Sequence, residues 1–183
     1  RIGVDAIDVL LIHRPDPLVD AHALGACLDS LIDAGKIRAA GVSNFMHWDM
    51  DLLQSFMKHR LVTNQIELSL MATAPLTNGQ MAQAQQHGQP VMAWSPLGGG
   101  RLWGQEPAAK RLLPKLKALA QAHHVDETAI AIAWLLHHPA QVLPVLGTND
   151  LSRIQALHKA FEVKLDRQTW FELYELAQGA EVP

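Results

Sequence analysis

Several polar side chains in this sequence follow apolar runs, at the positions where parallel sheets carry their chemistry. His13 comes directly after the apolar run Ile7–Ile12, and an imidazole there could be a catalytic group. Ser43, Asn44 and Gln65 end or interrupt two later runs, and their hydroxyl and amide groups both donate and accept hydrogen bonds. Because the carboxyl ends of parallel strands meet at one edge of a sheet, we expect these residues to share a site.

A second group of residues suits a ligand with a flat ring and a phosphate. Trp94 offers a planar apolar face, on which another ring can stack at little entropic cost. Ser95 and Leu97 lead into Gly98 and Gly99, the first two of three consecutive glycines, which let the backbone approach an anion closely. The alternatives are a tryptophan that packs in the core and a glycine run that forms a simple flexible turn.

A third group surrounds the end of the last apolar run. Gly147 and Thr148 precede a helix that we expect to open at Asn149-Asp150, and its N–H groups and positive dipole end suit a phosphate. Arg153 could add a charge-assisted contact. The pattern therefore predicts an anion-binding role for this helix start.

The other reactive side chains have mostly structural interpretations. A histidine at a strand end, including His13, can be a hydrogen-bonded structural residue rather than a catalyst. The remaining histidines lack the spacing of metal ligands, so no metal site is predicted. Glu67 and Asp16 could form the carboxylate pair of a hydrolase, but structural or loop roles suit them better. Cys27 is expected on the apolar face of a helix, where it would be inert.

The pattern of apolar residues predicts an α/β protein in which strands alternate with helices. The predicted strands are Ile7–Ile12, Lys36–Ser43, Leu61–Leu68, Val91–Ser95 and Gln141–Leu146. The predicted helices are Leu18–Ala34, Asp49–Lys58, Leu76–His87, Lys110–His123, Glu127–His137, Leu151–Phe161 and Arg167–Gln178. We expect the first strand to be buried on both faces and Gly98–Pro107 to be a long, mobile loop. This alternation predicts a parallel sheet, either a TIM barrel or an open doubly wound sheet.

Length and composition limit the class of protein. The chain has 183 residues, 49% hydrophobic and 18% charged, which predicts a single globular domain over residues 1–183. Its net charge of −3, without a Lys/Arg-rich block, argues against nucleic acid or acidic lipid as a partner. No apolar stretch approaches the roughly 20 residues that span a bilayer, and we expect no signal peptide. A single cysteine suggests a reducing compartment, so we expect a cytoplasmic protein.

The strand exits carry a resemblance to a known family. They read IHRPDP, GVSNF, TNQIELS, AWSPLGGGRL and LPVLGTNDLSRI, in this order, across essentially the whole chain. Together they resemble the aldo-keto reductase family, which implies a (β/α)₈ TIM barrel, a carbonyl substrate and usually NADP(H) as cofactor. The first strand would match the family's fourth. The chain would then be the C-terminal portion of such a barrel, a partial barrel of about five βα units, compared with about 250 residues for a complete one.

The resemblance also implies a role for each candidate site residue. His13 would be catalytic and would orient and polarise the substrate carbonyl. The implied cofactor contacts are Ser43, Asn44 and Gln65 with the nicotinamide carboxamide; Trp94 with the nicotinamide ring; Ser95, Leu97, Gly98, Gly99 and Gly100 with the pyrophosphate; and Gly147, Thr148 and Arg153 with the adenosine 2′-phosphate. Many relatives carry lysine where this chain has Gly147, and Ala156 and Leu157 replace polar residues, so NAD(H) is the alternative cofactor.

Part of the family's catalytic machinery is not found in this sequence. The reaction needs a tyrosine as general acid, a lysine that lowers the pKa of that tyrosine, and an aspartate paired with the lysine. Tyr174 is the only tyrosine and lies in the predicted last helix, where we expect it to pack or lie at the surface. The strands Ile7–Ile12 and Val142–Leu146 would also be open sheet edges, which promote association. We therefore expect either a missing N-terminal segment or a homo-oligomer that covers them.

Three functions remain open at this point. The first is NADP(H)-dependent reduction of aldehydes or ketones by hydride transfer, with this chain inactive alone because it lacks the tyrosine, lysine and aspartate. The second is a non-catalytic nucleotide-binding or interaction module derived from the same fold. The third, an unrelated barrel hydrolase, requires the resemblance to be misleading.

Overall fold

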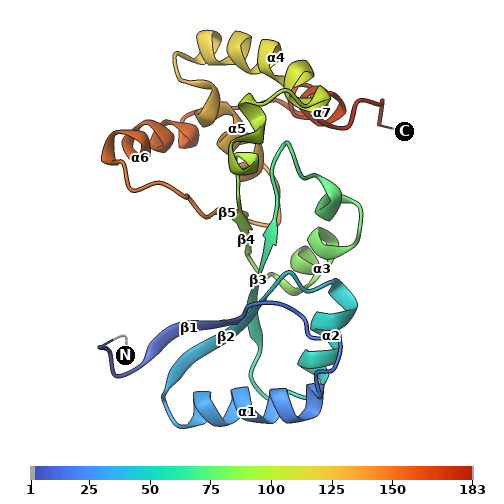
Figure 1. The fold of residues 1–183 in the computed structure, drawn as a ribbon, viewed down its shortest axis with the longest axis vertical. Helices are drawn as coiled ribbons and strands as arrows, with labels where there is room; N and C mark the ends of the chain where they lie inside the picture. Colours follow the sequence, from blue (N-terminus) through green and yellow to red (C-terminus); the bar gives the residue numbers. More distant parts are fainter. Residues whose placement is uncertain (1–2, 183) are drawn as a thin grey trace.

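A single parallel sheet organises the chain. The computed structural model describes residues 3–182, so Arg1, Ile2 and Pro183 of the predicted domain lie outside the described residues. The strands are β1 (Ile7–Ile12), β2 (Ile37–Ser43), β3 (Leu61–Glu67), β4 (Val91–Trp94) and β5 (Leu143–Pro144). They form one five-stranded sheet in the order β1-β2-β3-β4-β5, and every neighbouring pair is parallel. Figure 1 shows this sheet as the connection between helices at the two ends of an elongated molecule.

Helices follow each strand. The α-helices are α1 (Ala21–Asp33), α2 (His47–Ser55), α3 (Gln80–His87), α4 (Pro107–His123), α5 (Glu127–Leu136), α6 (Leu151–His158) and α7 (Arg167–Gln178). Short 3₁₀ helices occupy η1 (Ala74–Leu76), η2 (Gly98–Trp103) and η3 (Lys159–Phe161). Four of the α-helices begin after an aspartate whose carboxylate accepts a hydrogen bond from a backbone N–H of the first turn, namely Asp20, Asp126, Asp150 and Asp166.

The predicted fold class is confirmed. A doubly wound sheet reverses its strand order at a switch point, whereas here each strand pairs with the next one along the chain. Continuous parallel order with intervening helices is the arrangement of a (β/α) barrel. The structure is a partial barrel of this kind.

The prediction that the first strand is buried on both faces was wrong. None of the six residues of β1 is buried, and the side chain of Val9 is 43% exposed. The cause is its position, because β1 pairs only with β2 among the described strands. By contrast, buried and partly exposed side chains alternate in β4, which has neighbours on both sides. Burial of β1 therefore depends on a neighbour that local sequence does not encode.

Several predicted boundaries were also wrong. The fifth strand shrinks from Gln141–Leu146 to Leu143–Pro144, although the N–H of Val145 still donates to the carbonyl oxygen of Ala93 in β4 (2.9 Å). The third helix begins at Gln80 rather than Leu76, after η1 and a turn. The second lies at His47–Ser55 rather than Asp49–Lys58. Smaller shifts affect three other helices. The first begins at Ala21, the fourth begins at Pro107, and the sixth ends at His158.

One segment and one cysteine also differ from their predictions. The segment Gly98–Pro107 is not one long loop, because its first six residues form η2 and Pro107 already begins α4. Cys27 is exposed on α1 rather than on its apolar face, because Leu28 and Asp29 occupy the buried side.

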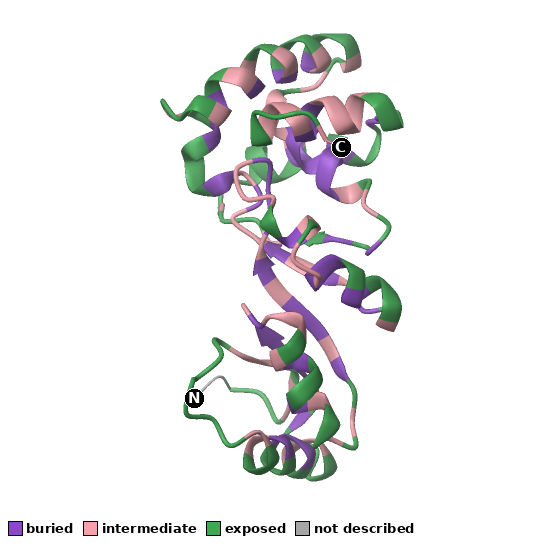
Figure 2. Cartoon of the chain, turned by 90° about the vertical axis from the view of Figure 1, so that its right-hand side faces the viewer, coloured by how far each residue is buried: buried purple, intermediate pink, exposed green. Residues whose placement is uncertain are grey.

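The core divides into two hydrophobic clusters. The first cluster joins α1 and α2 to the N-terminal strands, through Leu28, Ile37, Ala40, Val42, Phe45, Met50, Leu53 and Leu61. The second packs β3 and β4 against the C-terminal helices and includes Ile66, Ala93, Leu112, Leu116, Ile130, Trp134 and Leu173. Figure 2 shows buried segments along the central strands and in the C-terminal helices. Because β3 contributes Leu61 to one cluster and Ile66 to the other, it connects them.

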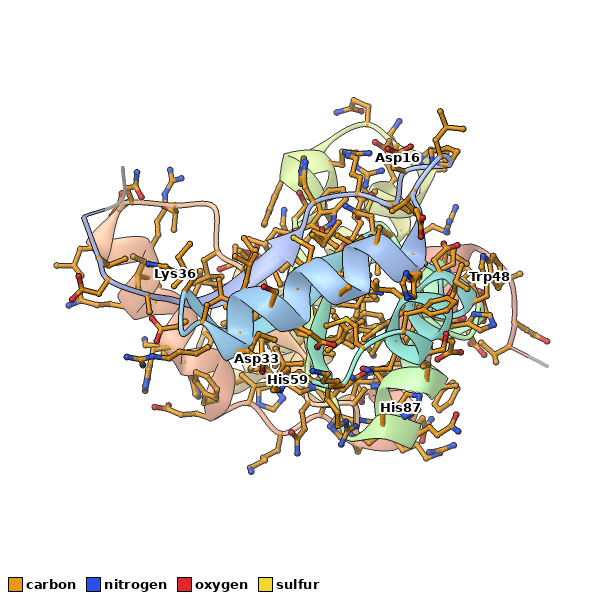
Figure 3. The ribbon with its side chains drawn as sticks, turned by 90° about the horizontal axis from the view of Figure 1, so that it is seen from below. Asp16, Asp33, Lys36, Trp48, His59 and His87 are labelled. Carbon is orange, nitrogen blue, oxygen red and sulfur yellow. The ribbon has the colours of Figure 1, made fainter. Side chains whose placement is uncertain are left out.

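A polar contact attaches the loop after α2 to α1. Asp29 is 5% exposed, and its carboxylate accepts hydrogen bonds from the backbone N–H groups of Lys58 (2.8 Å) and His59 (3.1 Å). Nε2 of His59 also lies 2.8 Å from Oδ1 of Asp33, near the end of α1 (Figure 3). This hydrogen bond with His59 is the main reason that the pKa of Asp33 lies below its ordinary value. The start of β3 is thereby fixed to the helix that precedes β2.

Two tryptophans connect α5 to α7 by stacking and by reciprocal hydrogen bonds. The rings of Trp134 and Trp170 are 4.9 Å apart and nearly parallel, at 9°. Nε1 of Trp134 donates to the carbonyl oxygen of Trp170 (3.1 Å), and Nε1 of Trp170 donates to that of Trp134 (3.0 Å). The ring N–H groups of buried Trp134 and partly buried Trp170 are therefore both satisfied, so this pair can pack at the core.

We expect Trp134→Ala to lower the free energy of unfolding by about 3–5 kcal/mol, because the ring is 1% exposed and its removal leaves a cavity. Denaturant unfolding followed by far-UV circular dichroism measures the change. Trp48→Ala is the control, since Trp48 is 57% exposed and its loss should change stability by no more than about 0.5 kcal/mol. Equal losses for the two variants would contradict the role assigned to the tryptophan pair.

Candidate functional site

Hydrogen bonds join the carboxyl ends of three strands. Oγ of Ser43, at the end of β2, donates to the carbonyl oxygen of Gln65 in β3 (2.9 Å). Nδ2 of Asn44 donates to Oγ of Ser43 (3.0 Å), and Nε1 of Trp94, at the end of β4, donates to Oδ1 of Asn44 (2.9 Å). We call His13, Ser43, Asn44, Gln65 and Trp94 the strand-end cluster. Its members come from β2, β3 and β4 and from the residue after β1.

Asn44 is central to this cluster because of its backbone conformation. Its φ is +59°, in the left-handed region, which asparagine tolerates better than most residues. Its N–H donates to the carbonyl oxygen of Gln65 (2.8 Å), and its Nδ2 lies 3.5 Å from the carbonyl oxygen of His13. The turn therefore directs one amide side chain toward both neighbouring strand ends.

The side chains of His13 and Gln65 remain available for a ligand. His13 is exposed, and within residues 3–182 its imidazole makes no hydrogen bond. Gln65 is partly exposed, and its only side-chain contact of this kind in the described chain is a weak one, 3.9 Å from Nε2 to Sδ of Met92. The sheet thus brings an imidazole and an amide to the same edge as the indole of Trp94.

The glycine run after β4 forms a compact turn. Gly98, Gly99 and Gly100 all have positive φ, and a Cβ on Gly98 would come within 2.8 Å of the Met71 side chain. Nε of Arg101 donates to the carbonyl oxygen of Gly98 (3.0 Å), and its guanidinium forms an ion pair with Glu67 at 2.8 Å. Glycine is therefore required here for both conformation and space.

The two carboxylates considered for a hydrolase have structural partners. Glu67 binds Arg101, as described, and Oδ1 of Asp16 accepts a hydrogen bond from the backbone N–H of Leu18 (2.9 Å). Both contacts agree with the structural roles that the sequence favoured.

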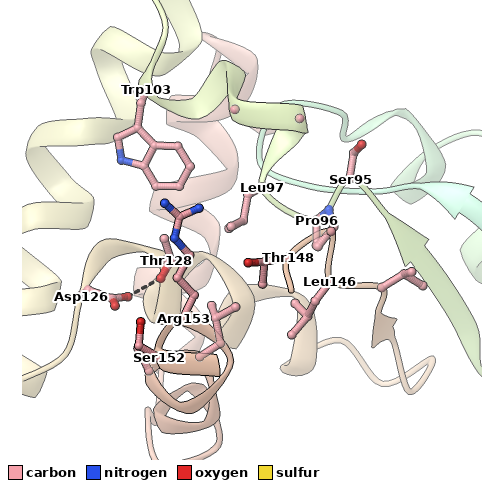
Figure 4. Close-up of a pocket in the computed structure, with 16 residues that line it drawn as sticks. Ser95, Pro96, Leu97, Trp103, Asp126, Thr128, Leu146, Thr148, Ser152 and Arg153 are labelled. Atoms are coloured by element: carbon pink, nitrogen blue, oxygen red, sulfur yellow. Dashed lines mark hydrogen bonds between the residues drawn. The ribbon is translucent and has the colours of Figure 1, made fainter. Parts of the chain in front are cut away.

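A cavity of about 740 Å³ lies between the glycine turn, the start of α5 and the start of α6 (Figure 4). Seven of the predicted cofactor residues line it: Ser95, Leu97, Gly99, Gly100, Gly147, Thr148 and Arg153. Gly98 is buried behind the lining, while the five members of the strand-end cluster lie outside it. Trp94 and Ser95 are consecutive, so the cluster and the cavity meet at the end of β4.

Other lining residues were not predicted from the sequence. They are Pro96, Trp103, Asp126, Thr128, Val145, Leu146, Ser152, Ala156 and Leu157. Ala156 and Leu157 were noted only as apolar replacements, and Asp126 only as a helix cap. Only Trp103 carried a signal in the sequence, because it is a tryptophan that follows a glycine-rich run. In the folded chain it is 43% exposed. Figure 4 shows Arg153 extending into the cavity toward Trp103.

Asp150 binds several donors at the predicted phosphate-binding helix start. Oδ1 of Asp150 accepts hydrogen bonds from the N–H groups of Ser152 (2.8 Å) and Arg153 (3.3 Å), and from Oγ of Ser152 (2.6 Å). The bond from the Ser152 hydroxyl is the main cause that lowers the pKa of Asp150 below its ordinary value. Nε of Arg153 also lies 3.8 Å from Oδ2 of Asp150. The Asp150 carboxylate therefore caps the helix start at which the sequence predicts a phosphate.

The arrangement suits most of a nicotinamide dinucleotide. The strand-end cluster offers amide groups and a flat ring for the nicotinamide, and the left-handed glycine turn leaves backbone exposed beside the cavity for the pyrophosphate. The cavity is of a size that accepts small ligands. At the predicted adenosine end, the N–H groups of Ser152 and Arg153 are bound to Asp150.

Tyr174 cannot act at this site from its position in α7. It is 5% exposed within the second hydrophobic cluster, and its hydroxyl is a hydrogen-bond partner of Gln178. The predicted packing role is confirmed. No three His, Cys, Asp or Glu side chains in the described part of the chain gather in a way that could hold a metal ion.

None of the helices within residues 3–182 combines the length and apolar composition that a membrane crossing requires.

Comparisons with known proteins agree with this arrangement. Residues 1–178 match the profile of the Aldo/keto reductase family. The chain is 55% identical to a 6-dehydroglucose reductase of Agrobacterium fabrum, covering 99% of this chain and 60% of that protein. It is 39% identical to a 6-dehydroglucose reductase of Novosphingobium aromaticivorans, again with 60% of the relative covered. The crystal structure of the thermostable aldo-keto reductase Tm1743 superposes with a TM-score of 0.84 at 26% identity, over 94% of this chain and 60% of that one.

The chain thus spans about 60% of the length of these relatives. The family match covers almost all residues of this chain. The continuous parallel sheet, the polar strand ends and the sequence matches lead to one assignment: the chain belongs to the aldo/keto reductase family.

Proposed function

We propose that the strand-end cluster and the cavity form the cofactor-binding part of a reductase that transfers hydride from a reduced nicotinamide dinucleotide to an aldehyde or ketone carbon. The observation that carries the proposal is the hydrogen-bonded chain from Ser43 through Asn44 to Trp94, directly beside Ser95 and the cavity. Family membership supports oxidoreductase chemistry. The cofactor is NADP(H) or NAD(H).

In this proposal the strand-end cluster orients the nicotinamide. Ser43, Asn44 and Gln65 hydrogen-bond the carboxamide, and the Trp94 indole stacks on the ring, so that one face points to the substrate. Because Nε1 of Trp94 is already bonded to Asn44, the indole is held in place before the ligand arrives. A pre-oriented ring lowers the entropic cost of reaching the reactive geometry.

His13 is the residue that we assign to the substrate. Its exposed imidazole, beside the strand-end cluster, can donate a hydrogen bond to the carbonyl oxygen, on which negative charge develops. The bound dinucleotide supplies the hydride. The remaining requirement is a proton for the alkoxide, and Tyr174 is buried in the wrong place to give one. We therefore propose that residues 1–183 bind the cofactor but do not complete the reaction alone.

The names of the relatives suggest the first substrate to test. Two relatives are 6-dehydroglucose reductases, which makes 6-dehydroglucose the first carbonyl compound to assay. Family membership makes a small carbonyl compound the substrate class. A non-catalytic nucleotide-binding module is the second candidate function, and the position of Tyr174 is the observation that favours it.

The exposed sheet edges also support a proposal about partners. Among the described strands, β1 pairs only with β2 and β5 only with β4, and Val9 and Leu143 on these edges are 43% and 50% exposed. We propose that further βα units of a longer protein, or a second copy of the chain, cover them. Nucleic acid and membrane are not proposed as partners. The proposed compartment is the cytoplasm, where the exposed Cys27 would stay reduced.

A titration tests the proposed function. We expect NADH or NADPH to quench the tryptophan fluorescence of the 183-residue chain in a saturable manner, because Trp94 contacts the nicotinamide. With 6-dehydroglucose present, the chain alone should not oxidise the bound cofactor. Turnover by this chain would contradict the missing proton donor, and absence of quenching by either nucleotide would contradict cofactor binding.

Substitutions of Asn44 separate its side chain from its backbone conformation. We expect Asn44→Gly and Asn44→Ala both to weaken nucleotide binding about tenfold, since each loses the amide that positions Trp94, worth about 1.4 kcal/mol. Both variants lose the hydrogen bonds of the amide, but Asn44→Ala should lower the free energy of unfolding by about 1–2 kcal/mol more than Asn44→Gly, because alanine is strained at φ +59°. Calorimetric binding and denaturant unfolding measure the two effects.

His124→Ala is the matched control for this pair. His124 ends α4 with φ +56°, outside both the strand-end cluster and the cavity lining, so its variant should lose stability but bind nucleotide normally. Weakened binding in Asn44→Ala but not in Asn44→Gly would show that strain, not the amide, is responsible.

A further inference from the structure

We propose that the adenosine end of the cavity selects NAD(H) over NADP(H), and that Asp150 is the residue that determines this specificity. The inference rests on the proposed function, because it concerns the cofactor of the same site. It follows from how the charged groups at the start of α6 are already paired.

Three donors at the start of α6 are engaged within the protein. The N–H groups of Ser152 and Arg153 and the hydroxyl of Ser152 all donate to Oδ1 of Asp150, at 2.6–3.3 Å. A phosphate at this helix start would have to displace a carboxylate that is covalently tethered one residue before the helix. Binding there would therefore break three hydrogen bonds before any new one forms.

The charge balance opposes a phosphate as well. Arg153 is the only cation among the residues that line the cavity, and it is 3.8 Å from Oδ2 of Asp150. The lining also contains Asp126, whose Oδ1 accepts the N–H of Ala129 (2.8 Å) and is bonded to the Thr128 hydroxyl. Figure 4 shows Asp126, Ser152 and Arg153 at the same end of the cavity. The lining thus carries one guanidinium and, with Asp150 at its edge, two carboxylates, whose negative charge repels an added phosphate and lowers its affinity.

An adenosine ribose without the phosphate meets no such obstacle. A neutral 2′-hydroxyl can donate a hydrogen bond to a carboxylate, which is how acidic residues recognise NAD in other dinucleotide sites. The Asp126 and Asp150 carboxylates are acceptors of this kind. Gly147 leaves open space in the same lining, because a Cβ at this position would have no neighbouring atom within 4 Å. Arg153 can pack its planar guanidinium against the adenine ring.

The test compares the two dinucleotides directly. Isothermal calorimetry of the 183-residue chain with NADH and with NADPH should give a Kd about tenfold lower for NADH, the effect expected of one unfavourable charge contact. The variant Asp150→Asn keeps an N-cap side chain but removes the charge. It should bind NADPH about tenfold more tightly than the native chain and leave the Kd for NADH within about twofold.

Asp166→Asn is the matched control. Asp166 caps α7 in the same way, through the N–H of Thr169 (2.7 Å), and does not line the cavity. This variant should leave both affinities unchanged, which separates a local charge effect from a general effect of losing a helix-cap charge.

The outcomes distinguish the two proposals. Equal or tighter binding of NADPH by the native chain, or an unchanged NADPH affinity in Asp150→Asn, overturns the specificity but leaves dinucleotide binding intact. Failure of both dinucleotides to bind overturns the proposed function, and the specificity with it. A preference for NADH that Asp150→Asn abolishes supports the assignment of Asp150.

Discussion

Parallel backbone pairing determines where the chemistry of this chain lies. The register that places Ser43 beside Gln65, and Glu67 beside Trp94, brings the ends of β2, β3 and β4 to one edge of the sheet. Helices return the chain between these strands, so residues far apart in sequence meet there without long loops. The hydrogen bonds of Asn44 then add side-chain connections to an arrangement that the backbone has already made.

Sequence could predict the site residues that lie at the carboxyl ends of strands. His13, Asn44 and Trp94 each come after or at the end of an apolar run, and a strand end is a local signal. Trp103 and Asp126 could not be found in this way, because they reach the cavity from a 3₁₀ turn and from the start of a helix. The exposure of β1 was missed for a related reason, since an apolar strand has the same sequence pattern whether or not a neighbour covers it.

The start of α6 shows how two local rules can give opposite predictions. A helix N-terminus attracts anions, and an aspartate at the N-cap position is itself such an anion. The N–H groups of this helix start were predicted to be available to a phosphate, although Asp150 directly precedes the helix in the sequence. The Asp150 carboxylate caps the helix, and because it is part of the chain it loses no translational entropy on binding these N–H groups. A phosphate at this helix start would compete with it for the same donors.

The shared strand β3 has a consequence for how this protein opens. Its two ends belong to different hydrophobic clusters, one with Leu61 and the other with Ile66. The cavity is lined entirely by residues 95–157, on the side of the second cluster, whereas Ser43 and Asn44 depend on β2 in the first. Partial unfolding around the first cluster would therefore separate Ser43 and Asn44 from an intact cavity. A ligand that contacts both would oppose this opening and make the two clusters exchange amide hydrogens together.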